Sequence, residues 1–423
     1  MKNGILRQRA GKEPIDMSIR RVVIVGAGAA GLMAASVAKH RADEVVIFER
    51  NKIAARKVRI TGKGRCNITN IADTEEILEN ITCNRRFMYS ALYGFTNYDV
   101  MTFFEDMGVS VKTERGGRVF PVSDSAHDVA EALLKAAKGD NVRIINKRVT
   151  KLMVKNSEIV GVMYEGGSLE CDSVIIATGG KSYPLTGSDG SGYTLASDVG
   201  HSIIFPKPSL VPLITKQKWV SELMGLSLKN VRLTVYEDNK QAYTDFGEML
   251  FTHFGISGPL VLSASAHMRN FEKKSYRAEI DLKPALDEKQ LDARILKDFE
   301  EAGKKHIINA LDKLLPKALI PVIIKISGID PHKDVTSVTK EERYNLGKAL
   351  KSLSVDITGT RPIDEAIITS GGINTKEINP STMESKLVSG LFFAGEVIDV
   401  DAYTGGYNLQ IAFSTGHLAG ENA

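Results

Sequence analysis

RVVIVGAGAAG, residues 21–31, joins an apolar segment to a glycine-rich turn. The glycines have the Gly-x-Gly-x-x-Gly spacing, in which each glycine has a different structural role. Gly26 permits a tight turn, Gly28 lets the backbone approach a pyrophosphate, and Gly31 lets the following helix pack closely on the strand. The stretch therefore predicts a strand-turn-helix unit that binds a dinucleotide.

A second apolar segment ends in an acidic residue, as this interpretation requires. EVVIFE closes on Glu49, about 20 positions after Gly28, where a carboxylate accepts hydrogen bonds from ribose hydroxyls. Between the two segments, Ala29 and Ala30 begin an alanine-rich helix whose first amides face the phosphates, because the helix dipole favours negative charge there. Both strands, the helix and the acid support a complete dinucleotide-binding fingerprint.

A second glycine cluster near the C-terminus favours FAD as the dinucleotide. Its pattern is strand, glycine turn, acid and helix start, over residues 390–409. A flavin is long, so its isoalloxazine ring needs a site far from the adenine, and amides at a helix start would stabilise the charge of a reduced flavin. Such turns also occur in other α/β proteins, which leaves that alternative open. The candidate cofactor-binding residues here are Gly395, Glu396, Gly406, Tyr407, Asn408 and Leu409.

Composition and charge exclude several classes of protein. The 423 residues are 43% hydrophobic and 25% charged, with a net charge of +4, so nothing in the bulk charge indicates a nucleic-acid partner. No apolar run approaches the roughly 20 residues that a membrane span requires, and residues 1–18 form a polar arm without a signal-peptide pattern. Three widely spaced cysteines predict neither a disulfide framework nor a metal site, and they fit a cytoplasmic location.

The order of strand and helix patterns predicts an α/β fold with nested inserts. A Rossmann-like FAD-binding domain of the glutathione-reductase type is interrupted by a β-barrel-like insert, which itself carries a small helical insert. Within the helical insert, the patterns predict helices that include residues 291–299, 305–315, 317–326 and 340–353. The expected segments are 1–18 for the arm, 19–203 and 367–423 for the FAD-binding domain, 204–285 and 354–366 for the β-rich insert, and 286–353 for the helical insert.

Four stretches closely resemble a known family. They are RKVRITGKGRCNITN at 56–70, ATGGKSYP at 177–184 with GSDG at 187–190, LFTHFGISGP at 250–259, and AGE at 394–396 with GGYN at 405–408. The chain resembles bacterial flavoproteins of the NAD(P)/FAD-dependent oxidoreductase family, which includes the bile-acid-inducible 3-dehydro-bile-acid Δ4,6-reductase and the aminoacetone oxidases. The resemblance runs from about residue 20 to the C-terminus. It implies FAD, the nested architecture and redox chemistry on a small molecule.

The basic loop after the second strand supplies further candidate cofactor contacts. Arg50, Arg56, Lys57 and Arg65 place positive charge near the expected pyrophosphate and flavin, although a solvated basic loop would have the same composition. Gly64 allows the loop to press its backbone against the flavin ring. Cys66 is expected near the flavin, either as a small packing residue or as a covalent attachment, and Asn67 is expected to hydrogen-bond the pyrimidine edge of the ring.

Other contacts follow from the resemblance. It implies that backbone groups of Val149 meet the adenine, and that Thr178, Gly179 and Gly180 pass beneath the cofactor. It also implies that Glu396 binds the ribityl or phosphate region. Many flavoproteins have aspartate at the corresponding position, and the longer glutamate leaves the exact contact open.

Catalysis needs a proton donor beside the flavin, because the flavin itself carries the hydride. The candidates are His253 and Tyr407, with Tyr183 and Tyr403 as further possibilities. We expect NAD(P)H to visit the flavin transiently as electron donor, since the chain has one complete dinucleotide motif.

The expected activity is reduction of a conjugated C=C bond in a 3-oxo steroid of the 3-dehydro-Δ4,6 bile-acid type. Phe251, Phe254, Ile256 and Pro259 would form an apolar wall for this small-molecule substrate. One alternative is an amine oxidase of the aminoacetone type, which would produce peroxide. Another is a non-catalytic or RNA-modifying flavoprotein, against which the near-neutral charge argues.

Overall fold

A parallel sheet forms the base of the molecule. The computed structural model describes residues 19–423, so the expected N-terminal arm lies outside the described residues. The sheet has the order β19-β10-β1-β2-β6 with all neighbours parallel. Its strands are β1 (Arg21–Val25), β2 (Glu44–Phe48), β6 (Val142–Ile145), β10 (Ser173–Ile176) and β19 (Leu391–Phe393). Three of these strands are almost wholly apolar and buried, as expected for a parallel sheet covered on both faces.

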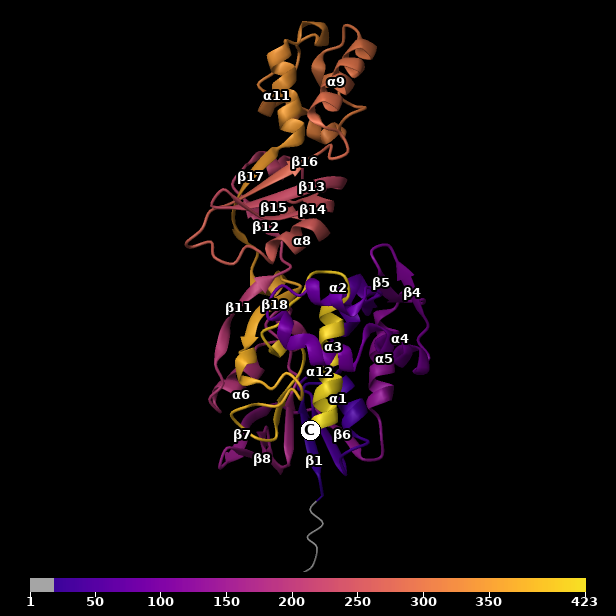
Figure 1. Cartoon of the computed structure of the whole chain (residues 1–423), viewed down its shortest axis with the longest axis vertical. Helices are drawn as coiled ribbons and strands as arrows, with labels where there is room; N and C mark the ends of the chain where they lie inside the picture. The colour runs from indigo at the N-terminus through magenta and orange to yellow at the C-terminus, as the bar shows by residue number, and fades with distance from the viewer. Residues whose placement is uncertain (1–18) are drawn as a thin grey trace, which may run out of the picture.

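Helices from the two ends of the chain pack together beside this sheet. Helix α1 (Ala29–Ala38) contacts α5 (Ala126–Ala137) and the C-terminal α12 (Tyr407–Asn422). The helices α1 and α12 approach closely because α12 has Gly416 and Gly420 on the contact. A Cβ atom at these glycines would lie 2.4 Å and 2.5 Å from the carbonyl oxygens of Ala30 and Ala34. Figure 1 shows α1 and α12, which follow the two glycine clusters of the sequence, close together beside the sheet.

Smaller elements complete this part of the fold. One three-stranded sheet has the order β3-β5-β4 and another has β7-β8-β9. The strands are β3 (Thr69–Asn70), β4 (Val111–Glu114), β5 (Arg118–Pro121), β7 (Val149–Lys155), β8 (Glu158–Tyr164) and β9 (Gly167–Glu170). The helices are α2 (Thr74–Glu79), α3 (Tyr89–Gly94), α4 (Asn97–Asp106) and α6 (Ser191–Ser197), with 3-10 turns that include η1 (Val58–Gly64).

Two antiparallel strands carry the chain out of this part and back. They are β11 (Ile203–Ser209) and β18 (Ile368–Ile373). Beyond them lies a closed barrel with the order β12-β15-β14-β13-β16-β17. Its elements are β12 (Leu213–Thr215), α7 (Trp219–Glu222), β13 (Ser227–Glu237), β14 (Lys240–Phe251), β15 (Gly255–Ser257), α8 (Pro259–Ser265), β16 (Tyr276–Asp281) and β17 (Leu353–Thr360). The predicted α/β fold with a Rossmann-type sheet and a barrel is confirmed; the exact segment boundaries remain a proposal.

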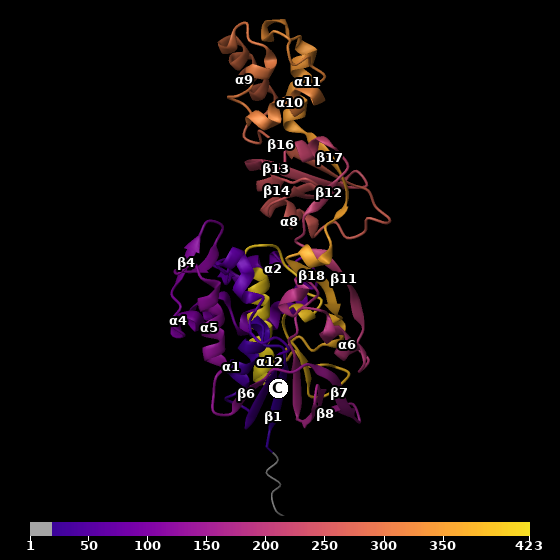
Figure 2. The same cartoon turned by 180° about the vertical axis from the view of Figure 1, so that it is seen from behind.

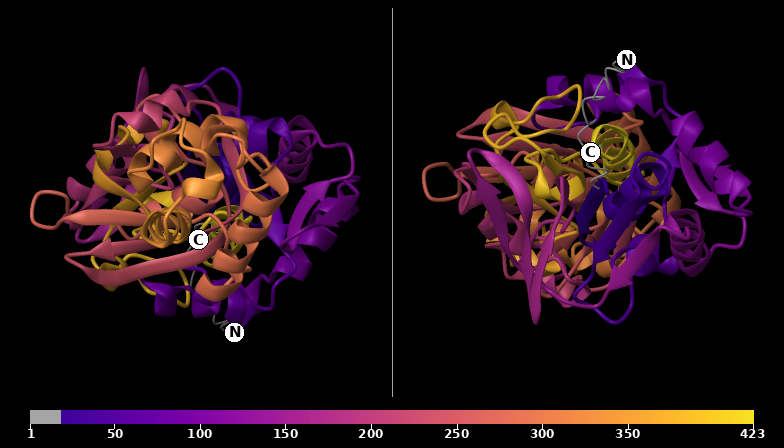
Figure 3. Two further views of the ribbon diagram at one scale, coloured as in Figure 1. Left: turned by 90° about the horizontal axis from the view of Figure 1, so that it is seen from above. Right: turned by 90° about the horizontal axis from the view of Figure 1, so that it is seen from below.

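A helical unit is inserted between β16 and β17 (Figure 2). It contains α9 (Glu288–Ala302), α10 (Ile320–Ser327) and α11 (Lys340–Lys351). Capping boxes begin two of these helices, at Asp287 with Gln290 and at Thr339 with Glu342. Its apolar residues share one core with the barrel, separate from the core around the parallel sheet. Seen along the long axis, the helical unit lies over the barrel (Figure 3, left).

The helix expected over residues 305–315 does not form. The structure has only a 3-10 turn, η4 (Ile307–Asn309), in this segment. Tertiary pairing explains the difference, because the backbone here bonds to a distant segment instead of to itself. The Ile307 amide donates to the Lys333 carbonyl at 2.9 Å, and the Val335 amide donates to the Lys305 carbonyl at 3.1 Å.

Candidate functional site

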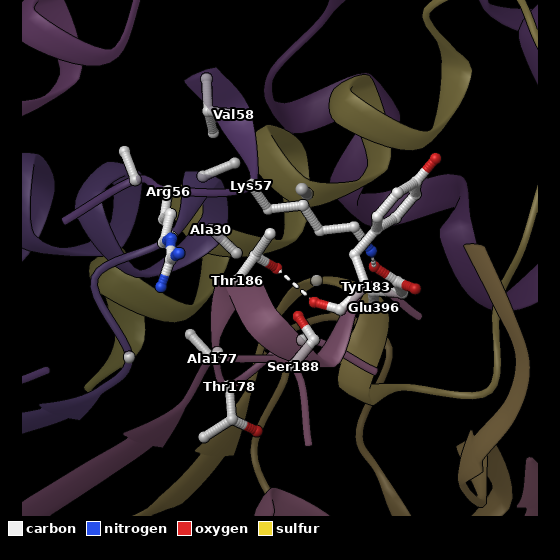
Figure 4. Close-up of a pocket in the computed structure, with 18 of the residues that line it drawn as sticks. Ala30, Arg56, Lys57, Val58, Ala177, Thr178, Tyr183, Thr186, Ser188 and Glu396 are labelled. Atoms are coloured by element: carbon white, nitrogen blue, oxygen red, sulfur yellow. Dashed lines mark hydrogen bonds and ion pairs between the residues drawn. The ribbon is translucent and has the colours of Figure 1, made fainter. Parts of the chain in front are cut away.

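A cavity of about 580 Å³ opens at the carboxyl ends of the parallel strands, where ligands bind in sheets of this type. Its walls come from the turn after β1, the end of β2, the loop around η1, the segment after β10 and the start of α12. The volume lies in the range of cofactor and small-molecule sites. Figure 4 shows labelled side chains from α1, the η1 loop, the segment after β10 and the C-terminal cluster gathered around the cavity.

Most of the residues predicted from the sequence line this cavity. They are Gly26, Gly28, Ala29, Ala30, Glu49, Arg50, Arg56, Lys57, Asn67, Val149, Thr178, Gly179, Gly395, Glu396, Gly406, Asn408 and Leu409. Those that do not line it are Gly31, Gly64, Arg65, Cys66, Gly180, Tyr407 and His253. The cavity therefore joins both glycine clusters, although about 360 residues separate them in the chain.

The three glycines of the first turn differ in what requires them. Gly26 has φ +106°, and a Cβ there would lie 2.6 Å from the Ala177 carbonyl oxygen. At Gly31 a Cβ would lie 1.9 Å from the carbonyl oxygen of Gly26. Gly28 has φ −88°, and a Cβ there would meet no atom within 4 Å, yet the residue lines the cavity. The fold itself therefore requires glycine at positions 26 and 31. At position 28 no protein atom excludes a side chain, so a requirement for glycine there would come from a bound ligand.

Glu49 is held in place by the backbone around it. The side chain lies at the cavity wall and is 8% exposed. Its Oε2 accepts from the Ala27 amide at 2.9 Å, and its Oε1 accepts from the Asn51 amide at 2.7 Å and from the Asn51 side chain at 2.9 Å. The carboxylate is thus preorganised beside the glycine turn, where it is predicted to accept hydrogen bonds from the ribose hydroxyls of a dinucleotide.

Glu396 forms an internal ion pair. Lys57 Nζ donates to Glu396 Oε2 at 2.7 Å and to Ser182 Oγ at 2.7 Å. Glu396 Oε1 accepts from Ser182 Oγ at 2.9 Å and from the Thr369 amide at 2.8 Å. These bonds tie together the η1 loop, the segment after β10, strand β18 and the C-terminal cluster. They give Glu396 a bridging position in the cavity wall in addition to its predicted role as a cofactor contact.

Positive charge predominates on the cavity wall. Arg50 pairs with Asp189, and Arg148 lies 3.2 Å from the same carboxylate. Three further lining cations, Arg56, Lys63 and Lys147, have no carboxylate partner among residues 19–423. Uncompensated cations at the wall of a cavity favour an anionic ligand such as a pyrophosphate.

Two buried polar atoms at the wall lack a hydrogen-bond partner within the described chain. They are Asn67 Oδ1 and Thr178 Oγ1. A buried polar atom without a partner is costly, and a bound ligand is one way to supply the partner. Together with the space at Gly28 and the unpaired cations, these atoms fit a polar dinucleotide.

Two residues of the basic loop point away from the cavity. Arg65 bonds to Glu114 and, at 2.6 Å, to Asp124, and its guanidinium lies 4.3 Å from the centroid of the Phe120 ring. Cys66 is fully buried, and burial raises the pKa of its thiol to about 12. These positions suit structural roles, namely a charge cluster on the β4–β5 hairpin and a small packing side chain.

The residues favoured as proton donors are not at the cavity wall. His253 is exposed in the turn between β14 and β15, with its ring 4.9 Å from that of Phe254. Tyr407 is buried at the start of α12, where its ring packs against Gly405. Phe251 and Ile256, expected in an apolar wall for substrate, belong to the core of the barrel. The assignment of His253 and Tyr407 therefore gains no support from the geometry.

The cavity wall also contains residues that the motifs did not single out. Leu210, Ile367 and Ile368 lie where the chain leaves for the barrel and returns, and Thr404 lies beside the C-terminal cluster. Tyr183 and Tyr403, considered only as further donors, also line the wall. The apolar residues could be found only once β11 and β18 were known to pair, because no spacing rule links positions so far apart.

No group of three or more His, Cys, Asp or Glu residues within 19–423 could hold a metal ion. In the same part of the chain, no helix is both long enough and apolar enough to cross a membrane.

Comparison with known proteins places the chain in a family. Residues 20–422 match the family model described as HI0933-like protein Rossmann domain. The chain is 32% identical over 411 residues to the 3-dehydro-bile acid delta(4,6)-reductase of Clostridium scindens, covering 96% of this chain and 99% of that one. It is also 32% identical over 401 residues to the ribosomal RNA dihydrouridine synthase of Haemophilus influenzae, covering 93% and 96%.

A solved structure, the open conformation of a flavocytochrome c3 fumarate reductase, aligns with a TM-score of 0.48 and 16% identity, covering 95% of this chain and 78% of that one. The family model spans nearly the whole chain, and the sequence relatives are matched over nearly their whole length. The chain belongs to the HI0933-like Rossmann-domain family of flavoprotein oxidoreductases.

Proposed function

We propose that this protein is an FAD-dependent reductase that adds hydrogen across a carbon–carbon double bond conjugated to a carbonyl group. The observation that carries the proposal is that two equally similar relatives have names describing this one kind of reaction. A 3-dehydro-Δ4,6 bile acid has its double bonds in conjugation with the 3-oxo group. Formation of dihydrouridine saturates the C5=C6 bond of uracil, which is conjugated to the C4 carbonyl.

The cavity residues suit FAD. We propose that Glu49 binds the adenosine ribose, the amides after Gly28 bind the pyrophosphate, and the amides after Gly406 face the flavin ring. Arg56 supports this placement as an unpaired cation on the wall. When bound, FAD supplies the hydride for the electron-poor carbon of the substrate, and the protein orients the substrate and supplies a proton.

We propose NAD(P)H as the electron donor. The chain has one Gly-x-Gly-x-x-Gly turn, and FAD would occupy it, so the nicotinamide must visit the exposed flavin face and leave before the substrate binds. An alternating mechanism of this type predicts parallel lines in double-reciprocal plots of initial rates. Intersecting lines would indicate that donor and substrate are bound together.

The first candidate substrate is a 3-oxo steroid with Δ4 or Δ4,6 unsaturation. Its support is the Clostridium scindens relative and the apolar side chains of Leu210, Ile367 and Ile368 on the wall nearest the barrel. The apolar wall expected around His253 no longer contributes to this argument, because Phe251 and Ile256 lie in the barrel core.

The second candidate substrate is a uridine in RNA. The Haemophilus influenzae relative is as similar to the chain as the bile-acid reductase is, and unpaired Arg56 and Lys63 on the wall suit a polyanion. The near-neutral net charge of +4 counts against a broad RNA-binding surface, so the charge would have to be local.

A substrate panel under anaerobic conditions tests the proposal. The FAD-loaded protein is reduced with NADH or NADPH and mixed with a 3-oxo-Δ4,6 steroid, the saturated 3-oxo steroid, or a ribosomal RNA transcript. We expect one unsaturated compound to reoxidise the flavin and to gain two hydrogens by mass, and the saturated steroid to do neither. Peroxide production from aminoacetone in air, with no response to the unsaturated compounds, would favour the amine-oxidase alternative instead.

A further inference from the structure

A tyrosine of the cavity wall is hydrogen-bonded to a histidine of the barrel. Tyr403 lies just before α12 and lines the cavity beside Thr404 and Gly405. His267 follows α8, and its Nε2 lies 2.6 Å from the Tyr403 hydroxyl. This contact joins the two halves of the molecule at the end of the cavity where the C-terminal glycine cluster lies.

The histidine lines a second cavity. It has a volume of about 270 Å³, and its wall includes His267, Arg269, Lys274 and Tyr276. Tyr403 lines the first cavity only and His267 the second only, so their hydrogen bond connects the walls of the two cavities. The second cavity is polar and large enough to hold water.

We propose that Tyr403 is the catalytic proton donor of this reductase and that His267 passes it a replacement proton from water in the second cavity. The proposal rests on the proposed function, because it assigns the proton that reduction of a conjugated double bond requires. Nothing in the sequence motifs points to His267, which lies outside the stretches that resemble the family.

In the proposed step the substrate gains one hydride and one proton. A hydride forms a new C–H bond at the carbon β to the carbonyl, and the π electrons move toward the carbonyl oxygen. The α-carbon then takes the proton of the Tyr403 hydroxyl, which leaves a phenolate. The phenolate takes the Nε2 proton of His267 while Nδ1 takes a proton from water, and the hydroxide that remains is neutralised by bulk solvent. Exchange with solvent then returns the imidazole to its Nε2–H form, so the net change is one hydride and one solvent proton added to the substrate.

The local environment keeps each group in the protonation state that this step requires. Burial, and then the charge of Asp245, raises the pKa of Tyr403, so the phenol keeps its proton at neutral pH. Burial, and then the charge of Arg269, lowers the pKa of His267, with Asp401 acting in the opposite direction, so the imidazole is neutral. A neutral imidazole can donate at one nitrogen and accept at the other.

Neighbouring side chains fix the pair and complete the set of charges around it. The Tyr243 ring packs on His267 with centroids 5.0 Å apart and lies 6.4 Å from that of Tyr403. Asp401 is buried and lies 3.6 Å from Arg269, which offsets its charge. Facing His267 from the second cavity, Lys274 is paired with Glu237. Asp245, whose carboxylate accepts from the Tyr243 hydroxyl at 3.1 Å, has no cationic partner among residues 19–423 and is the uncompensated charge near the pair.

The test separates reduction of the flavin from reduction of the substrate. Tyr403→Phe removes the proton donor, and His267→Gln keeps a hydrogen-bonding side chain that cannot relay. Tyr344→Phe is the matched control, because Tyr344 is exposed on α11, far from both cavities. FAD content per chain is measured first. We expect Tyr344→Phe to be reduced by NAD(P)H at the wild-type rate, and the rate of flavin reduction in the other two variants is measured so that it can be compared with their rate of transfer to the substrate.

Transfer to the substrate should distinguish the variants. In Tyr403→Phe, reoxidation by the unsaturated substrate should slow by a factor of about 100 or more, the range of general acid catalysis. In His267→Gln it should slow and lose the wild-type dependence on pH, which a merely structural role would not remove. Reoxidation at the wild-type rate in both variants would overturn the assignment. No turnover by wild-type protein with any compound of the panel would instead contradict the proposed function itself.

A measurement without turnover checks the contact directly. In the oxidised protein, the imidazole carbon resonance that is missing from His267→Gln identifies His267. It should titrate below the ordinary histidine range and shift in Tyr403→Phe, whereas Tyr344→Phe should leave it unchanged. An imidazole that titrates normally and does not respond to Tyr403→Phe would contradict the proposed pair, even if a variant bound FAD poorly.

Discussion

Substitution of Gly28 by alanine should change the affinity for FAD while leaving the stability of the apoprotein almost unchanged. The backbone at Gly28, with φ −88° and ψ −165°, is one that alanine adopts without strain. The new Cβ would meet no protein atom within 4 Å. The reduced freedom of the unfolded chain stabilises such a variant by about 0.4–1 kcal/mol, and the poorer N-cap offsets this by a similar amount. We expect the free energy of unfolding of the apoprotein to change by less than about 1 kcal/mol.

FAD binding should respond quite differently. The added methyl group projects into the cavity, where the pyrophosphate is proposed to approach the backbone. Overfilling a close-packed site typically costs about 1–3 kcal/mol, which corresponds to roughly a 5- to 150-fold weaker Kd for FAD. The assay is titration of apoprotein with FAD by flavin fluorescence, together with thermal melting of the apoprotein.

Gly31→Ala is the contrasting variant. Its Cβ would lie 1.9 Å from the Gly26 carbonyl oxygen, so the helix must move away from the turn and the apoprotein itself should melt at a lower temperature. Gly28→Ala with an unchanged Kd for FAD would refute the reasoning that the space beside Gly28 belongs to the ligand. Equal loss of apoprotein stability in both variants would refute the distinction between the two glycines.

Three further outcomes follow from single residues. Glu49→Ala should weaken FAD binding by about tenfold or more, as measured by fluorescence titration. It should also lower the melting temperature of the apoprotein, because the amides of Ala27 and Asn51 lose their acceptor. Denaturation should release all FAD and leave a chain of unmodified mass, since the buried Cys66 has a pKa raised to about 12 and lies off the cavity wall; a flavin adduct on the chain would contradict this. Burial lowers the pKa of His201, so the folded state resists protonation of this side chain and the free energy of unfolding should fall as the pH drops below about 6.5. Urea titration at several pH values measures this fall, which should be weaker in His201→Gln.

The sequence predicted the parallel sheet and the dinucleotide turn because both depend on local signals. Strands β1, β2 and β10 are apolar runs, and the turn is fixed by glycines that cannot be replaced without a clash at Gly26 and Gly31. Most of the residues that these motifs single out line one cavity, since the carboxyl ends of parallel strands meet at one edge by topology alone.

What the sequence could not predict depended on contacts between distant segments. The segment at 305–315 has a helical pattern, but its backbone pairs with residues 333–335 instead. His253 has a promising motif, yet the barrel places it in an exposed turn, while His267 has no motif and meets Tyr403 only because α8 packs beside the C-terminal cluster. Neither outcome follows from spacing along the chain.

The most direct test of the central claim is the stoichiometry of substrate reduction without oxygen. NAD(P)H-reduced protein, freed of excess nicotinamide, is mixed with a 3-oxo-Δ4,6 steroid or with a uridine-containing ribosomal RNA transcript, and flavin absorbance and product mass are followed together. We predict that one of these compounds restores the oxidised flavin spectrum and yields one saturated product molecule for each flavin reoxidised. A flavin that stays reduced in the presence of both compounds, yet reoxidises at once in air, would contradict the account.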